Sequence, residues 1–149
     1  MLRFLQVNEK KPIPILVAGE ALTRGMAVTQ DYADNTIKKA TATSGFFLVD
    51  NAPNYDGLNA VYSPTDGSFE TITSGAKALL IPVYVGERYA TTELTIGTLT
   101  KGASIKSSAG KFVAAVANDV CEWVYGGTYS DPTGLTMYVV ECVPSHTVS

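Results

Sequence analysis

The sequence predicts an all-β protein, a single-domain β-barrel or β-sandwich of short antiparallel strands with an extended N-terminal arm. Three observations carry this prediction. Short apolar runs alternate with Gly, Pro, Asn and Asp turn signals, helical periodicity is nearly absent, and one strand–turn–strand motif occurs twice. A chain of 149 residues is long enough to form one domain with its own core.

The repeated motif reads LTRGMAV at 22–28 and LTKGASI at 99–105, an offset of 77 residues. A polar turn and a second apolar strand follow each copy, so we interpret 19–42 and 97–116 as two related hairpins within one β domain, 15–149. Two copies do not make a solenoid. The cation before each glycine is expected to be a solvated turn residue or to bind a partner's carboxylate.

The N-terminal segment, 1–14, is predicted to be an arm or an edge strand that leads into the first hairpin. Pro12 and Pro14 flank Ile13, which favours extended backbone and excludes a central strand. An arm that lies on a neighbouring subunit and a frayed terminus are both compatible with this pattern.

The middle of the chain continues the same alternation of strands and turns. The run 46–49 suits a strand buried on both faces, and 50–59 is a loop dense in Asn, Asp, Pro and Gly. Asp-Gly at 66–67 predicts a hairpin turn. The run 78–85 is the strongest candidate for a central strand.

The C-terminal part predicts two long paired strands, 120–125 and 137–142, around a projecting loop, 126–134. The expected register places Cys121 opposite Cys142, where a disulfide is geometrically possible. Buried free thiols, the usual state in a reducing compartment, are the alternative.

Composition excludes several classes of function. The net charge is −3, and no basic run exceeds two residues, so we expect no direct binding to nucleic acid. The longest apolar run is too short to cross a bilayer, and the first residues lack a secretory signal, so we expect no membrane partner and synthesis in a cytoplasm. Only 17% of residues are charged, which favours a surface that partly faces other protein.

The sequence offers little catalytic chemistry. His146 is the only imidazole, and its place near the C-terminus predicts a solvated side chain, so we expect no enzyme. The acidic loops 31–35 and 50–59 carry oxygen ligands that suit Ca²⁺, but the second lacks the closing Glu of an EF-hand, and Asp and Asn are common in turns. We therefore expect no metal and no cofactor.

The segment 19–28, followed by Ile-Lys-Lys-Ala at 37–40, resembles the opening of tailed-bacteriophage head decoration (cement) proteins and related capsid accessory proteins. The second copy, 97–116, has the same pattern of a glycine-containing turn followed by a hairpin. The resemblance implies a non-enzymatic virion protein that binds the outer capsid surface as a homotrimer and bridges subunits of the major capsid protein. Each weak contact gains from the others on one oligomer.

Contacts with the capsid are expected on the N-terminal arm and on loop tyrosines, because an extended arm can add a strand to a neighbour and Tyr is a good contact residue. The expected interface residues are Leu2, Phe4, Leu5, Val7, Ile13, Tyr55 and Tyr129.

Two other functions remain open. A tail-tube or head-tail joining protein would use a long β-hairpin and form rings. A carbohydrate-binding or host-adhesion module would stack sugars on Trp123, Tyr125, Tyr129 and Tyr138. Trp123 and Tyr125 share one strand face, however, and that face can equally be core.

Overall fold

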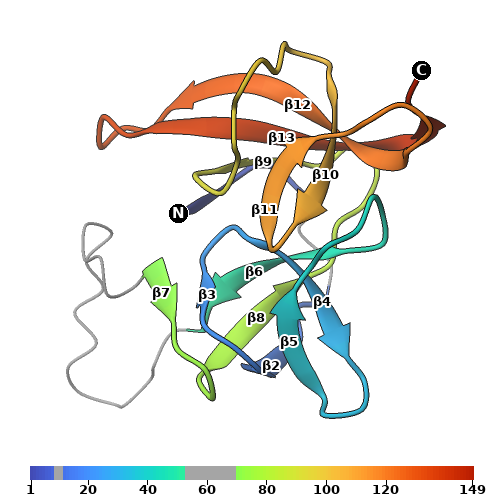
Figure 1. Cartoon of the computed structure of the whole chain (residues 1–149). Coiled ribbons are helices and arrows are strands. Elements are labelled where there is room, and N and C mark those ends of the chain that lie inside the picture. Colours follow the sequence, from blue (N-terminus) through green and yellow to red (C-terminus); the bar gives the residue numbers. More distant parts are fainter. Residues whose placement is uncertain (9–11, 53–69) are drawn as a thin grey trace.

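The computed structural model describes residues 1–8, 12–52 and 70–149, which fold almost entirely into β-strands (Figure 1). The prediction of an all-β fold is confirmed. The hairpin expected at 66–67 and the side chain of Tyr55 lie outside the described residues.

The first half of the fold is a closed five-stranded barrel with the strand order β2-β5-β4-β6-β8. β2 and β5 pair in parallel and the other neighbours are antiparallel. The barrel interior is aliphatic, with Val28, Ile37, Val49 and Leu80 among its buried side chains. The strands are β2 (Ile15–Ala18), β4 (Ala27–Asp31), β5 (Thr36–Lys39), β6 (Phe47–Asn51) and β8 (Lys77–Ile81), with a short pair, β3 (Leu22–Thr23) and β7 (Thr71–Ile72), beside them.

The second half is a six-stranded antiparallel sheet with the order β1-β9-β13-β12-β10-β11, drawn above the barrel in Figure 1. Its longest elements, β12 and β13, form one hairpin. The strands are β1 (Leu2–Gln6), β9 (Arg88–Thr91), β10 (Ser104–Ser108), β11 (Lys111–Ala114), β12 (Val120–Ser130) and β13 (Thr136–Thr147).

The two copies of the sequence motif fold alike. In each, a β-turn places its glycine in the left-handed region, with φ 88° at Gly25 and 90° at Gly102. The same bond then ties the turn to a neighbouring strand: the N–H of Gly25 donates to the carbonyl of Val49 at 2.8 Å, and the N–H of Gly102 donates to that of Tyr125 at 2.7 Å. Glycine recurs here because a side chain is strained at this φ.

The likeness extends to five strands. Two sets of five strands have the same order along the chain and the same neighbours in their sheets. In chain order they are β2, β4, β5, β6 and β8 in the barrel, and β9, β10, β11, β12 and β13 in the second sheet. The parallel pairing that closes the barrel, Ala18 with Ile37, also has a counterpart, because Leu94 forms an isolated parallel bridge with Phe112. The chain therefore contains two copies of one five-stranded unit.

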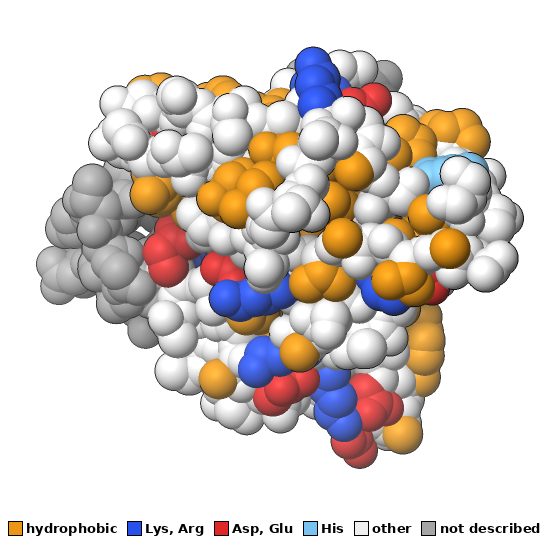
Figure 2. All heavy atoms as spheres, turned by 45° about the horizontal axis from the view of Figure 1, so that its top comes forward, with side chains coloured by type: hydrophobic (Ala, Val, Ile, Leu, Met, Phe, Trp, Pro, Cys, Tyr) orange, Lys and Arg blue, Asp and Glu red, His pale blue; other side chains and the backbone are white. Residues whose placement is uncertain are grey.

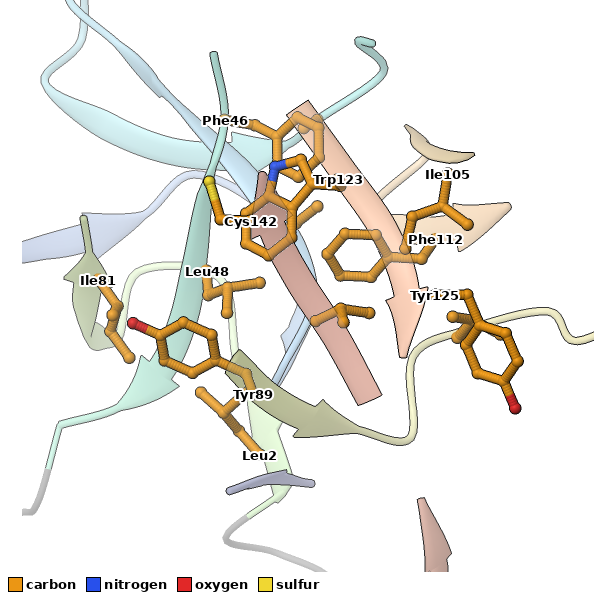
Figure 3. Packing of buried hydrophobic residues seen from close by; sticks show 14 residues of the cluster. Leu2, Phe46, Leu48, Ile81, Tyr89, Ile105, Phe112, Trp123, Tyr125 and Cys142 are labelled. Carbon is orange, nitrogen blue, oxygen red and sulfur yellow. The ribbon is translucent and has the colours of Figure 1, made fainter. Parts of the chain in front are cut away.

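One large core joins the two units (Figure 3). Trp123 stacks on Phe46 with ring centroids 5.4 Å apart and an interplanar angle of 7°. Leu48 and Ile81, from strands of the barrel, pack into the same cluster as the residues of the second sheet. The barrel interior is a separate apolar cluster, so the outer face of β6 and β8 serves as the floor of the shared core.

Residues 2–6 do not form a free arm. They are β1, which pairs antiparallel with β9 at one edge of the sheet. The N-terminal amino group lies 2.7 Å from Oε2 of Glu70 and donates to Oγ1 of Thr92 at 2.7 Å. The sequence predicts an arm or an edge strand for 1–14, and residues 2–6 form an edge strand.

The predicted loop 126–134 and the predicted cysteine register are wrong. β12 continues to Ser130, and only five residues, 131–135, separate it from β13. The turn and a bulge between Tyr125 and Gly127 set a different register, in which Cys142 lies opposite Trp123 and not opposite Cys121. Both thiols are free and buried.

Candidate functional site

The interface residues expected from the sequence separate into two groups. Leu2 is only 3% exposed and belongs to the shared core, so it is not available to a partner. Val7 is half-buried against that core, and Tyr129 is half-buried on β12 and not on a loop. The remaining described members, Phe4, Leu5 and Ile13, are exposed.

Phe4 and Leu5 stand on a strand that is held firmly. The ring of Phe4 meets Tyr89 edge-on, with centroids 5.6 Å apart. Nε of Arg3 donates to Oδ1 of Asp131 at 2.6 Å, which connects β1 to the turn between β12 and β13. This contact, with the hydroxyl and N–H of Thr133, holds the pKa of Asp131 well below its usual range.

A second apolar row lies on and beside β2. Ile13, Ile15 and Val17 alternate along the chain and are all exposed, and the exposed fraction of Ile15 reaches 58%. Alternate residues of a strand share one face, so these side chains form a stripe on the outside of the barrel. Sequence reasoning included only Ile13, although the period of two was visible in the sequence.

The cation of the first motif copy is buried, which overturns the expectation for Arg24. This side chain is 4% exposed and donates to the carboxylate of Asp50 and, at 3.0 Å, to Oε1 of Glu70. Lys101, its counterpart in the second copy, is exposed. The two cations therefore have different roles at the same turn.

Asp31 and Asp50, the described aspartates that begin the two acidic loops, each pair with a cation of the chain. Asp31 accepts a bond from Nζ of Lys38 at 2.7 Å, which lowers the pKa of Asp31, and Asp50 is paired with Arg24. Within the described ranges, no three His, Cys, Asp or Glu side chains gather as metal ligands. The residues 53–59 of the acidic loop 50–59 lie outside those ranges.

His146 is not in a loose tail but on β13, where it meets a serine. Its Nε2 lies 2.8 Å from Oγ of Ser104, and its Nδ1 lies 3.2 Å from the carbonyl oxygen of Pro144. Here the second ring nitrogen faces a backbone carbonyl, and the contact links β13 to β10.

The aromatic platform considered for sugar binding is part of the core. Trp123 and Tyr125 are buried in the shared cluster, so their faces contact protein. Tyr138 packs against the same cluster.

No family model, curated protein or solved structure matches this chain. In the described residues, no helix is long and apolar enough to span a bilayer.

Figure 2 shows one face of the molecule, where hydrophobic side chains reach the surface among polar ones and charged side chains form small mixed groups. The candidate functional site is therefore an apolar contact surface with two parts, β1 and the stripe of β2.

Proposed function

We propose that this chain is a non-enzymatic structural virion protein that binds the outside of a bacteriophage capsid and stabilises it by bridging major capsid subunits. The observation that carries the proposal is the exposed apolar pair on β1, Phe4 and Leu5, which stands on a strand anchored by the pair of Arg3 with Asp131. Several weak contacts of this kind on one oligomer act together, which suits a protein that connects identical capsid subunits.

The surface chemistry supports the same proposal. The stretches that resemble capsid decoration proteins are the two motif copies, and these form the turns and hairpins around which both units are built. Low charge and exposed apolar side chains are compatible with a protein–protein interface. We place the capsid contact on β1, where Phe4 and Leu5 are exposed on a strand with fixed ends.

Co-sedimentation with capsids tests the proposal. Purified chain is mixed with DNA-filled shells, stripped of accessory proteins, of the bacteriophage that encodes it. We expect binding that saturates at a fixed number of copies per shell and raises the temperature at which the shells rupture. Shells that take up no protein would overturn the proposal.

A matched pair of variants locates the contact. Leu5→Asp is expected to weaken shell binding at least tenfold while the melting temperature stays unchanged, because Leu5 is exposed. Tyr32→Asp, at an exposed position of the β4–β5 turn, serves as the control and should bind as the parent chain does. Equal binding by both variants would place the contact elsewhere.

The long β12–β13 hairpin favours one other candidate, a tail-tube or head-tail joining protein. Its strands contain 11 and 12 residues, the longest in the described chain. Electron microscopy of virions with antibody to the chain separates the two functions. Label over the whole shell supports decoration, whereas label confined to the tail or its junction supports the alternative.

A further inference from the structure

Among the described strands, β1 and β2 carry exposed apolar side chains beside an open edge, and they differ in suitability for pairing with another chain. β1 forms the outer edge of the six-stranded sheet, but its pairing contains an irregularity between Phe4 and Gln6. Bulges protect edges from further pairing. The pairings of β2 with β5 and with β8 contain no such irregularity.

The backbone of β2 leaves two residues facing outward. The carbonyl of Pro14 accepts a bond from the N–H of Leu80 at 3.0 Å, so Pro14 faces β8. Backbone groups of successive residues in a strand point to opposite sides, so those of Ile13 and Ile15 point away from β8. On that side β5 pairs only with Val17 and the residue after it, so among the described residues no strand lies beside Ile13 and Ile15.

The second unit shows what kind of strand pairs at the corresponding edge. β9 is the counterpart of β2 in the strand order; Ala90 lies opposite Val139 of β13, and Ile15 lies opposite Leu79 of β8. An antiparallel strand, β1, covers that edge of β9, with Arg3 opposite Ala90. Ala90 is 0% exposed, in contrast to Ile15 at 58%. Within the described part of the chain, the first unit thus lacks a strand that the second possesses.

We propose that a second copy of this chain fills the position, with residues 13–15, at the start of β2, pairing antiparallel to the same residues of the partner subunit about a two-fold axis at Pro14. In this register Ile13 lies opposite Ile15 of the partner subunit, and the two exchange backbone hydrogen bonds on both sides of the axis. Pro14, which has no N–H to donate, stands at the centre in a non-hydrogen-bonded position.

The chemistry of the edge fits a copy of itself. The isoleucines of both subunits line up on one face, where β-branched side chains pack well across strands. Self-complementary contacts of this kind are typical of two-fold dimers. The chain's own β1 cannot fill the gap, because Leu2 is buried and Arg3 is paired with Asp131 in the second unit. A two-fold dimer replaces the homotrimer implied by the resemblance.

Light scattering on the purified chain tests this without any capsid, so its result is independent of the proposed function. We expect a mass of twice 15.8 kDa that falls to the monomer on dilution. Ile15→Lys should shift the mass to the monomer, and at concentrations where the parent is also monomeric its melting temperature should equal that of the parent, because the side chain is exposed in the single chain. Val85→Lys, also at an exposed apolar position, should leave the dimer intact. A parent chain that is monomeric or trimeric, or an Ile15→Lys chain that remains dimeric, would overturn the proposal.

Cross-linking tests the register. Facing residues at a non-hydrogen-bonded position have Cα atoms about 4.5 Å apart, within the range of a disulfide. Pro14→Cys should therefore form a covalent dimer under mild oxidation, whereas Val85→Cys should not. The native thiols are buried and do not compete. A Pro14→Cys chain that cross-links no faster than Val85→Cys would contradict the register.

Discussion

Arg24 and Lys101 occupy the same position in two copies of one turn, yet Arg24 is buried between two carboxylates and Lys101 is exposed. The turn of the first unit lies next to the N-terminus of the chain, whose amino group contacts Glu70 and the carbonyl of Arg24. An identical local structure therefore acts as a buried ionic anchor in one unit and as an ordinary surface turn in the other.

Removing the two cations should have unequal effects. Arg24→Met leaves Asp50 without its cation and removes one of the two cations beside Glu70, which keeps the N-terminal amino group. Breaking such a buried pair costs about 3 kcal/mol of unfolding free energy. Lys101→Met should change it by less than about 0.5 kcal/mol, as most surface substitutions do. Urea denaturation of both variants measures the difference, and equal losses would show that the Arg24 pairs contribute no stability.

The two turn glycines provide a second matched pair. A Cβ at Gly25 would meet Oγ1 of Thr91 at 2.4 Å and the carbonyl oxygen of Met1 at 2.8 Å, whereas one at Gly102 would meet no atom within 4 Å. Both positions have positive φ, so each alanine costs about 1 to 2 kcal/mol from backbone strain. Gly25→Ala should lower the melting temperature well beyond Gly102→Ala because it adds the steric conflict. Similar losses would mean that Thr91 and Met1 move aside freely.

Acid should weaken the attachment of β1. The pKa of Asp131 is lowered in the folded chain, so its contribution to stability is complete above the unfolded pKa of about 4 and is lost as the pH falls toward the folded value. The urea midpoint should decrease from pH 6 to pH 3, and less so for Asp131→Asn. Asp31 and Asp119 also have lowered pKa values from their lysine partners, so part of the decrease should remain. An unaltered pH profile in Asp131→Asn would contradict this account.

The thiols should resist modification in the folded chain. Burial raises the pKa of Cys142 to about 11 and also raises the pKa of Cys121, so both are protonated at pH 8. An aromatic disulfide reagent at pH 8 should label neither thiol until denaturant is added, and then both. A mass reduced by two hydrogens before labelling would instead reveal a disulfide and contradict the register of β12 and β13.

The sequence was sufficient for the fold class and for the repeated turn, because both depend on local signals. Gly25 and Gly102 each require a conformation that other residues rarely adopt, and the polar turns between apolar runs set the strand boundaries. Closure of the first unit into a barrel depends on the parallel contact of β2 with β5, which no local signal announces.

The long hairpin shows why a local reading can mislead. The sequence predicts that Gly126 and Gly127 belong to a loop, but both residues lie inside β12. A Cβ at Gly126 would meet Cγ1 of Val139 at 2.7 Å, and Gly127 has φ 106° at a bulge. Here glycine serves a close approach and a bulge within a strand, and composition does not distinguish these roles from a turn.

The interface residues were only partly predictable for a related reason. Leu2 and Phe4 have the same apolar character and both lie opposite residues of β9, yet Leu2 is buried in the shared core and Phe4 is exposed. Only the packing of the folded chain creates this difference. The link between Ser104 and His146 depends on β13 extending to Thr147, farther than the apolar alternation of its sequence indicates.

The pairing of β1 with β9 also constrains the order in which the chain can fold. Leu2 lies opposite Thr91, so the contacts of β1 must wait until the ribosome has released the residues of β9. The strands of the first barrel, which end at Ile81, all emerge before that point. The barrel can therefore close while synthesis continues, and β1, which is made before the barrel strands, takes its place only after a later part of the chain has arrived.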